Sequence, residues 1–560
     1  MSTRRRIVQL ARDQVPGDEL TERFVGEYYH EMPSVDLDDR GVGDLLAVAL
    51  AHLQLGRTRR WGETCVDVVS PDREIDGWHS PRSVLLLVTD DAPFLVDTVR
   101  MVLDRHGLET HLLVHPMLEV RRDDAGRLLD CTDVSPSSRS ASADATGVEA
   151  WTQVEIDRCD ASAAAALVAD VREIVEEVHG IVADFPAMRS WMDELATEDP
   201  LLAWLADGNF VFLGAATYDR DAHGGLVARA GTELGILRRP HPIDPAPVPV
   251  EISDQTPVVV SRSDAESRIH RPARRTCISV RAGDGARHRF LGLLASSAYR
   301  QSVLDIPVVG DRVRSVLGLT GDTGVSYSAR AARNVLETLP RDLLFELDAD
   351  SLARLTIDVV GLQERHLVRV FDVPEPVGDN STVMVYLPRS RFHAELPDAV
   401  AQAVADAYGS GFRDVESLVG QSSLARITCT VTRSTASGVE LDQLAARIDE
   451  LSTSWSDRVI EALVGELGEQ QGRRLAGRHL DAFPAEYRAN VGPARAVSDL
   501  LRIDELVESG ARLATSLGRD RRASGSSAST TVISRSRSRR CCRCSDISVS
   551  RPSTNDPRRS

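Results

Sequence analysis

The spacing of the apolar residues changes twice within residues 85–120, and this pattern restricts the fold more than any other feature of the chain. Residues 83–88 form a continuous apolar run, which is typical of a buried strand. Residues 95–103 then carry apolar positions at helical spacing, and Gly107 marks the expected helix end. From 110 to 120 the period becomes two, which predicts a second strand.

The next segments continue an alternation of strands and helices. Residues 121–128 are typical of a hairpin turn, and 150–157 have the composition of a further strand. A helix is expected over 161–195, because its apolar residues recur at spacings of four and three. The order β-α-β-β-β-α predicts a ferredoxin-like sandwich with an extra strand or a bent hairpin.

The whole chain is expected to be an α+β protein, in which ferredoxin-like units are joined by a β-rich domain and helical segments. The predicted parts are an N-terminal helical segment (1–79), a first ferredoxin-like domain (80–198), a β-rich domain (199–300), a helical connector (301–365), a further ferredoxin-like domain (366–470), a helical segment (471–519) and a disordered Arg/Ser-rich tail (520–560).

Lysine is absent from the sequence, so all 66 basic residues are arginine. This excludes a phosphate-binding P-loop, a pyridoxal-phosphate Schiff base and any lysine nucleophile. The Gly-x-Gly-x-x-Gly fingerprint of dinucleotide sites is also missing, since the nearest runs, 41–46 and 409–414, lack the third glycine. A net charge of −18 argues against specific nucleic-acid binding.

The cysteines and the apolar runs indicate a cytoplasmic location. No signal peptide or run long enough to span a membrane is visible in the sequence. Five of the eight cysteines lie far apart in the body of the chain, without metal-ligand spacing, and are expected to be reduced packing residues. They are Cys65, Cys131, Cys159, Cys277 and Cys429.

The loop after the first strand is the main candidate for a binding site. Asp90 and Asp91 are expected mainly to cap the next helix, with Pro93 in its first turn. The alternative is an effector loop formed by these residues with Arg100, since a strand that enters a helix leaves backbone N–H groups for a small polar ligand.

Two other groups have weaker claims to a function. His111 and His115 share one face of a strand but lie about 13 Å apart, so solvated or hydrogen-bonded histidines are favoured over a metal site. Arg271, Arg274 and Arg275 are expected to lie in a solvated loop, with binding of an anion or an acidic surface as the alternative. No catalytic, cofactor or metal residue is predicted.

The sequence resembles the N-terminal region of the large bacterial NAD-specific glutamate dehydrogenases. Ordered blocks over about 20–515 carry the resemblance. They include "VTDDAPFLVDTVRMVLDRHGLETHLLVHPMLEVRRDDAGRL" (88–128), "LLAWLADGNFVFLGAATYD" (201–219), "RFLGLLASSAYRQSVLDIPVV" (289–309) and "AFPAEYRANVGPARAVSDL" (482–500).

The resemblance implies ACT-like regulatory domains in a homo-oligomeric enzyme that converts L-glutamate to 2-oxoglutarate with NAD⁺. That chemistry relies on lysines, so this chain is expected to be catalytically incomplete and to bind no NAD itself. An amino-acid effector is the expected partner. The alternatives are a stand-alone oligomerisation or sensing module and a non-functional gene fragment. The Arg/Ser-rich composition after about 519 suggests a frameshift or a truncation.

Overall fold

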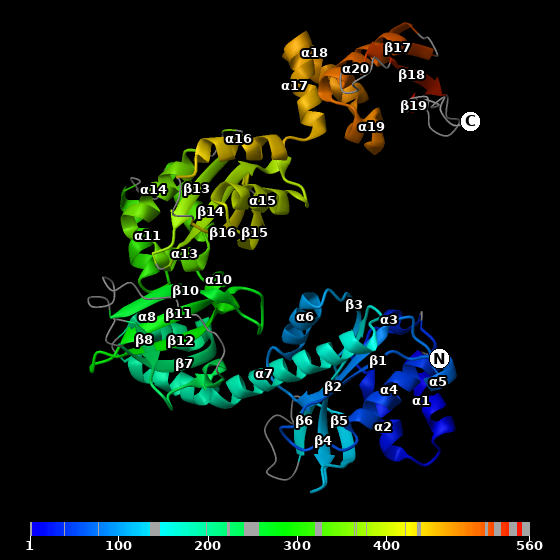
Figure 1. Ribbon diagram of the computed structural model, residues 1–560, viewed down its shortest axis with the longest axis vertical. Helices are drawn as coiled ribbons and strands as arrows, with labels where there is room; N and C mark the ends of the chain where they lie inside the picture. Colours follow the sequence, from blue (N-terminus) through cyan, green and yellow to red (C-terminus); the bar gives the residue numbers. More distant parts are fainter. Residues whose placement is uncertain are drawn as a thin grey trace. The chain divides into compact units, whose positions relative to one another are not determined.

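The structure is a computed structural model of the 560-residue chain. It describes residues 3–38, 40–76, 78–134, 146–197, 199–220, 225–239, 257–319, 327–362, 365, 367–376, 378–420, 422–433, 438–509, 513–519, 528–536 and 546–550. Two compact units are distinguished (Figure 1): Met1–Gly361 with Glu375–Gly378, and Leu362–Pro374 with Asp379–Ser560.

The first unit begins with helices and continues into an antiparallel sheet. Its helices are α1 (Thr3–Gln14), α2 (Glu19–Tyr28), α3 (Ser34–Asp38), α4 (Val42–Gly56), α5 (Arg73–Asp76), α6 (Leu95–Arg105) and α7 (Ala161–Leu195). The strands are β1 (Cys65–Val69), β2 (Ser83–Asp90), β3 (Thr110–Val114), β4 (Met117–Arg122), β5 (Leu128–Asp133) and β6 (Thr146–Ile156). The strand order is β1-β2-β6-β4-β5, and β3 also pairs with β6.

This topology confirms the ferredoxin-like prediction and corrects it in two places. Strand β1 lies inside the segment predicted as helical, 1–79, and pairs with β2 at the position that the last strand of a βαββαβ unit would take. The strand expected over 110–120 is broken at His115–Pro116, because proline has no N–H for the ladder. Its halves β3 and β4 both pair with β6.

Helices cover both faces of this sheet (Figure 1). Helices α6 and α7 pack on one face, while α1, α2 and α4 form a second layer, here called the N-terminal layer. Four alternate residues of β6 point towards that layer and are all buried: Glu149, Trp151, Gln153 and Glu155. This β6 row is mostly polar, although it lies between a sheet and a helical layer.

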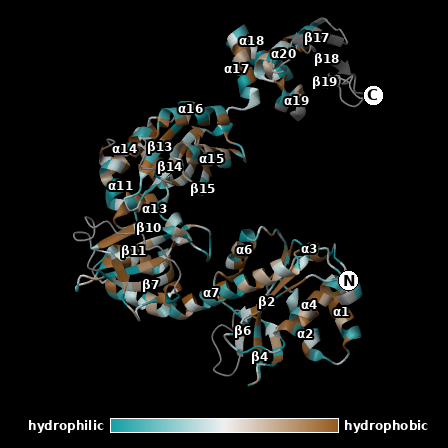
Figure 2. Cartoon of the chain, viewed as in Figure 1, coloured by the Kyte–Doolittle hydropathy of each residue, from teal (hydrophilic) through white to brown (hydrophobic). Residues whose placement is uncertain are grey.

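The β-rich domain of the first unit has the predicted strands. They are β7 (Phe210–Arg220), β8 (Leu226–Ala228), β9 (Leu234–Gly235), β10 (Val258–Glu266), β11 (Arg274–Arg281) and β12 (Arg287–Leu294). Their order is β10-β11-β12-β7-β8, and Figure 2 shows both hydrophobic and hydrophilic residues in this part of the chain. Residues 240–256, which precede β10, lie outside the described residues.

Short helices flank the strands of this domain, and the predicted helical connector follows it. They are α8 (Pro200–Trp204), α10 (Ser296–Arg300), α11 (Val309–Leu319), α12 (Tyr327–Thr338), α13 (Arg341–Glu346) and α14 (Ala349–Val360), with single helical turns at Leu205–Asn209 and Ile236–Arg238. The connector therefore has the helical structure that its apolar spacing predicts.

The second unit contains the second predicted ferredoxin-like domain. It consists of β13 (Arg369–Pro374), β14 (Asn380–Pro388), a turn at Arg389–Arg391, α15 (Leu396–Tyr408), β15 (Phe412–Val419), β16 (Leu424–Thr432) and α16 (Leu441–Ser452). The order β13-β14-β16-β15 repeats that of the first sheet, again with an early strand at the outer position. Helices α15 and α16 pack on one face through aliphatic residues of β14 and β16.

The end of the second unit is helical and then forms strands. Its elements are α17 (Trp455–Leu467), α18 (Glu469–His479), a turn at Leu480–Ala482, α19 (Ala485–Asn490), α20 (Pro493–Ser509), β17 (Leu513–Arg519), β18 (Ala528–Ser536) and β19 (Asp546–Ser550). Strands β18 and β19 lie within the tail predicted as disordered over 520–560, and its other residues lie outside the described residues. The Thr, Val and Ile content of β18 favours this conformation. Among the described residues, no helix is long and apolar enough to cross a membrane.

Candidate functional site

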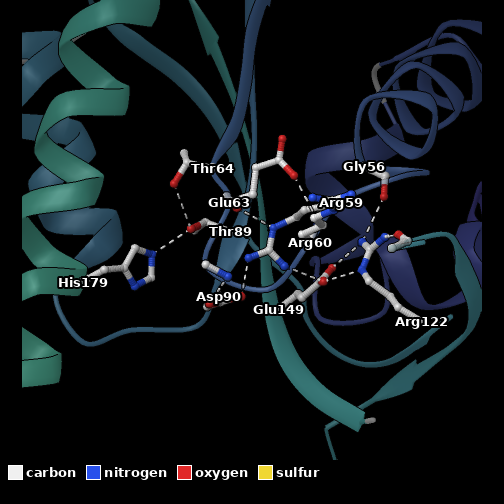
Figure 3. Close-up of polar contacts among 12 residues, drawn as sticks. Gly56, Arg59, Arg60, Glu63, Thr64, Thr89, Asp90, Arg122, Glu149 and His179 are labelled. Carbon is white, nitrogen blue, oxygen red and sulfur yellow. Dashed lines mark hydrogen bonds and ion pairs between the residues drawn. The ribbon is translucent and has the colours of Figure 1, made fainter. Parts of the chain in front are cut away.

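A buried network of charges lies where β2 ends, beside the loop that the sequence singles out (Figure 3). Glu149 of β6 accepts from two arginines: Arg59 Nη1 lies 2.6 Å and Arg122 Nε 2.7 Å from Glu149 Oε1. Arg59 also pairs with Asp90, whose other oxygen accepts from the Gly62 N–H at 2.9 Å. The side chains of Arg59 and Glu149 are 0% exposed, against 31% for Asp90.

Strand register explains why these side chains meet. Asp90 and Glu149 are cross-strand partners, so their side chains leave the sheet on the same face, towards the N-terminal layer. Arg59 follows α4 and approaches from that layer, while Arg122 ends β4. Two arginines and two carboxylates sum to zero charge, which allows the group to be buried.

Backbone carbonyls satisfy the remaining arginine donors. Arg59 Nε donates to the Glu63 carbonyl at 2.7 Å. Arg122 donates to the carbonyls of Gly126 and Gly56 at 2.8 and 2.9 Å (Figure 3). Because the donors are paired, the network joins the end of α4, the β4–β5 turn and the first strand-to-helix corner into one rigid group.

The predicted helix cap at Asp90 or Asp91 is wrong. Helix α6 starts at Leu95, and its N-cap is Phe94, which has a φ of 68° and makes no side-chain cap bond. Asp90 is bonded to Arg59 and the Gly62 N–H instead, and Pro93 precedes the helix rather than lying in its first turn. The Asp90 carboxylate is therefore bound within the charge network and is not available to cap α6.

Helix α7 contacts the same corner through a histidine. His179 Nε2 lies 2.7 Å from the Thr89 hydroxyl, as Figure 3 shows. Burial lowers the pKa of His179, while the nearby Asp90 and Asp91 oppose that shift. The imidazole is therefore favoured in its neutral form, as a hydrogen-bonding partner for Thr89.

The other residues of the predicted effector loop lie on the surface. Asp91, Pro93 and Arg100 are exposed, and the Asp91 N–H donates to the Val148 carbonyl at 3.1 Å. Pro93 and Phe94 line an apolar cavity of about 260 Å³, with Phe185 on its far wall. The structure therefore separates Asp90, which is engaged internally, from three residues that a ligand could reach.

The two histidines of the next strands make separate hydrogen bonds. His111 Nε2 lies 2.7 Å from Asp157 Oδ1, and His115 Nδ1 lies 2.7 Å from the Thr152 hydroxyl. Glu109, His111 and Asp157 bring possible metal-binding atoms within 4.8 Å of one another. The ion pair with Asp157 already provides the hydrogen-bonded role that was favoured for His111.

The predicted solvated cluster of Arg271, Arg274 and Arg275 does not form. Arg274 and Arg275 are buried at the start of β11, and only Arg271 lies in the preceding loop. Arg274 pairs with Asp264 at 3.5 Å, and Arg271 donates to the Leu294 carbonyl at 3.1 Å. Arg274 and Arg275 belong to β11 and not to the loop before it, so the expected loop position is wrong for these two residues.

Sequence reasoning missed Arg59, Arg122 and Glu149. One signal was available, because residues 149–155 alternate strictly between polar or aromatic side chains and small or apolar ones. A strand of this kind inside a domain needs a polar partner layer. Most partners come from positions 24–59 and one, Arg122, comes from β4, and the sequence connects none of them to the strand.

Four family models match the chain, and all describe parts of glutamate dehydrogenase. They are the ACT1 domain (24–171), helical motif 1 (306–365), the ACT2 domain (369–456) and helical motif 2 (462–506). The ACT1 match includes the whole charge network, and the ACT2 match corresponds to the second ferredoxin-like domain.

Curated relatives match most of the chain. It is 30% identical to the NAD-specific glutamate dehydrogenase of Halomonas elongata, over 89% of this chain and 33% of the relative. The proteins of the same name from Pseudomonas aeruginosa and Mycobacterium tuberculosis are 30% and 27% identical, over 87% and 83% of this chain. The chain thus spans about a third of the length of these relatives.

Proposed function

The chain belongs to the glutamate dehydrogenase family, and on that premise we propose that it acts as the N-terminal regulatory and assembly portion of an NAD-dependent glutamate dehydrogenase. The reaction of the parent enzyme would be oxidation of L-glutamate by NAD⁺, followed by hydrolysis with one water, to give 2-oxoglutarate, ammonium, NADH and a proton. One observation carries the proposal: two ACT domains repeat one strand order.

The residues of this chain do not fit NAD. A dinucleotide site of the usual kind lies at the carboxyl ends of parallel strands, where a glycine-rich turn leads into a helix. Every strand pairing among the described residues is antiparallel. The sequence has no such turn and no lysine to bind a substrate carboxylate. No step of the parent reaction is therefore assigned to these residues.

The loop between β2 and α6 in the first ACT domain supports a role in sensing a small effector. Asp91, Pro93 and Arg100 are accessible there, while Asp90 fixes the loop to the buried network. A small polar effector, such as an amino acid, would contact the exposed residues, and the network would transmit any shift of the loop to α4 and β6. Assembly into a homo-oligomer is the second part of the proposal, and a cytoplasmic location is the third.

An activity assay on the isolated chain tests the proposal most directly. We expect no formation of NADH from L-glutamate and NAD⁺, and measurable turnover would overturn the regulatory assignment. Light scattering on the same sample tests assembly, for which a clean monomer would be the contrary result. A monomer with no amino-acid ligand would favour the runner-up, a gene fragment without a function of its own.

A further inference from the structure

A cluster of one histidine and two carboxylates lies where β3 begins and β6 ends. It consists of Glu109, just before β3, His111 within β3 and Asp157, just after β6, and is called the β3 triad here. One ligand atom from each residue lies within 4.8 Å of the other two. We propose that the β3 triad binds a Zn²⁺ ion, with water in the fourth position. The inference goes beyond the proposed function and does not depend on it.

A β-bulge brings His111 to this position. Thr110 pairs with Ile156 and Leu112 pairs with Glu155, so His111 is an extra residue between two consecutive partners on β6. A bulge of this kind redirects a side chain, and bulges are common beside functional sites. Here the imidazole is directed to the end of β6, where its Nε2 lies 2.7 Å from Asp157 Oδ1.

The neighbouring helices do not explain the two carboxylates of the triad. The N-cap of α7 is Asp160, whose side chain accepts from two N–H groups of the first turn, so Asp157 is not needed as a cap. Helix α6 ends before Gly107, and Glu109 follows that end, where a negative charge opposes the helix dipole. A role outside helix capping is therefore required for both residues.

The charges of the triad favour a cation. The Glu109 N–H donates to Asp157 Oδ2 at 3.1 Å, but the Glu109 carboxylate has no partner in the described part of the chain. The pKa of Asp157 is lowered first by the hydrogen bond with His111 and then by the Glu109 N–H, while Arg82 contributes less. A divalent ion would attract both carboxylates, which otherwise repel each other.

The donor atoms of the triad select the metal. One imidazole nitrogen and two carboxylate oxygens suit Zn²⁺, whereas Ca²⁺ and Mg²⁺ prefer oxygen ligands alone. Ligand atoms at about 2.0–2.2 Å from a tetrahedral Zn²⁺ lie about 3.3–3.5 Å from one another. The bonded atoms of His111 and Asp157 would therefore separate slightly, and the Glu109 carboxylate would move inward.

The side chains of the triad are accessible, while their backbone is fixed. Asp157 is 46% exposed, His111 is 20% exposed and Glu109 is also exposed, so an ion can reach all three from solvent. Pairing of β3 with β6 and the bond from the Glu109 N–H hold the two segments together. Binding thus requires rotation of side chains without movement of the strands.

His106 provides a matched comparison in the same domain. Its Nε2 lies 2.8 Å from Asp170 Oδ2, and its side chain is 21% exposed, so this pair closely resembles that of His111 with Asp157. Among the residues that the structure describes, however, the β3 triad is the only group in which a third ligand joins such a pair. The third ligand, Glu109, should therefore decide which histidine binds the ion.

Isothermal titration of the full chain with ZnCl₂ tests the inference. The background carries serine in place of the closely spaced Cys541, Cys542 and Cys544, because thiolates would compete for the ion. We expect one Zn²⁺ to bind per chain in this background. Replacement by Co²⁺ should give the weak visible bands of an ion with nitrogen and oxygen ligands, without the near-ultraviolet band that a thiolate ligand produces.

Variants then assign the ligands. The affinity for Zn²⁺ should fall about tenfold or more in each of Glu109→Gln, His111→Gln and Asp157→Asn, because a weakly binding amide replaces a metal ligand. His106→Gln is the matched control and should leave the affinity unchanged. Circular dichroism verifies that each variant folds.

Three results would overturn the inference. The first is the absence of Zn²⁺ binding in the serine background. The second is an equal loss of affinity in His106→Gln and His111→Gln, which would show binding to surface histidines in general. The third is a loss in His111→Gln and Asp157→Asn but not in Glu109→Gln, which would leave a two-residue contact with an adventitious ion only. The NADH assay and light scattering decide the proposed function separately.

Discussion

The two ACT domains share a strand order but differ at the corner where the first central strand leads into a helix. In the first domain, Asp90 faces Glu149 across the sheet, and both carboxylates are bound by arginines. At the corresponding position of the second domain, Pro388 faces Leu424. One topology thus forms with either a charged or an apolar corner, which indicates that the charges serve something other than the fold.

Strands β6 and β16, each the third strand of its ferredoxin-like unit, also differ in the side chains on the face opposite the two packed helices. In the first domain this row is Glu149, Trp151, Gln153 and Glu155. Each member contacts a residue from the helices of the N-terminal layer or from the segments next to α4: Arg59, Phe24, Tyr28 and Arg40, respectively. In the second domain the row contains Arg426 and three threonines, Thr428, Thr430 and Thr432. The first domain therefore uses its second face to attach a helical layer through specific polar contacts.

Loss of Glu149 should have the largest effect among the tests of this difference. Glu149→Leu leaves Arg122 buried without a carboxylate and Arg59 with Asp90 alone, and we expect a loss of about 3–5 kcal/mol in the free energy of unfolding. The triple variant Arg59→Met, Glu149→Leu, Arg122→Met imitates the apolar corner of the second domain and should recover much of that loss. Urea denaturation measures both, and a cost below about 1 kcal/mol for the single variant would mean that the network is solvated.

Gly56 tests how tightly the N-terminal layer fits the β6 row. A Cβ at this position would lie 2.2 Å from the Trp151 ring, so Gly56→Ala should destabilise the chain by about 1–3 kcal/mol. The matched control is Gly180→Ala within α7, where a Cβ meets nothing within 4 Å. That change should stabilise by up to about 1 kcal/mol, because alanine is the better helix former. Thermal unfolding should give opposite signs, and equal signs would contradict the tight contact.

His52 makes the stability of the first domain dependent on pH. It is fully buried between Tyr28 and the Leu87 carbonyl, and burial lowers its pKa to about 3 from 6.5. The unfolded chain therefore binds the proton first, so stability is complete above pH 6.5 and falls as the pH decreases towards 3. At pH 5 the loss should be about 2 kcal/mol, from about 1.4 kcal/mol per pH unit.

The variant His52→Gln isolates that contribution. It keeps a donor for the Leu87 carbonyl but cannot titrate, so the difference in stability between pH 7.5 and pH 5 should shrink by about 2 kcal/mol. Denaturation at the two pH values is the measurement. An unchanged pH dependence would show that other groups cause the acid sensitivity.

The sequence predicted the elements that have strong periodicity. Helix α7 and the strands around it follow from apolar spacing alone, and so does the repeated α/β unit. The contacts of Asp90 at the end of β2 could not be predicted, because this residue is bound by Arg59, which lies 31 residues earlier, and by the Gly62 N–H. A local rule assigns an aspartate before a helix to the cap, whereas a nonlocal arginine with a buried guanidinium binds it more strongly. Strand β1 was missed for the same reason, since it is short and its partner follows later in the chain.

The smallest expected effect concerns a feature that the two ACT domains share. Helices α6 and α15 both end at a glycine with positive φ, Gly107 at 67° and Gly409 at 64°. The closing bonds also match, from the Leu108 N–H to the Leu103 carbonyl at 3.0 Å and from the Ser410 N–H to the Ala405 carbonyl at 3.1 Å. A Cβ at either glycine meets nothing within 4 Å, so only the backbone conformation opposes a substitution.

Gly107→Ala and Gly409→Ala should therefore cost the same, about 1 kcal/mol each, because an L side chain disfavours the left-handed region by that amount. The corresponding asparagine variants should cost less, since asparagine tolerates this conformation. Thermal unfolding of the four variants gives the comparison. Unequal alanine costs would show that the corners of the two domains influence the far ends of their first helices, which would extend the difference between the domains from the strands into the helices.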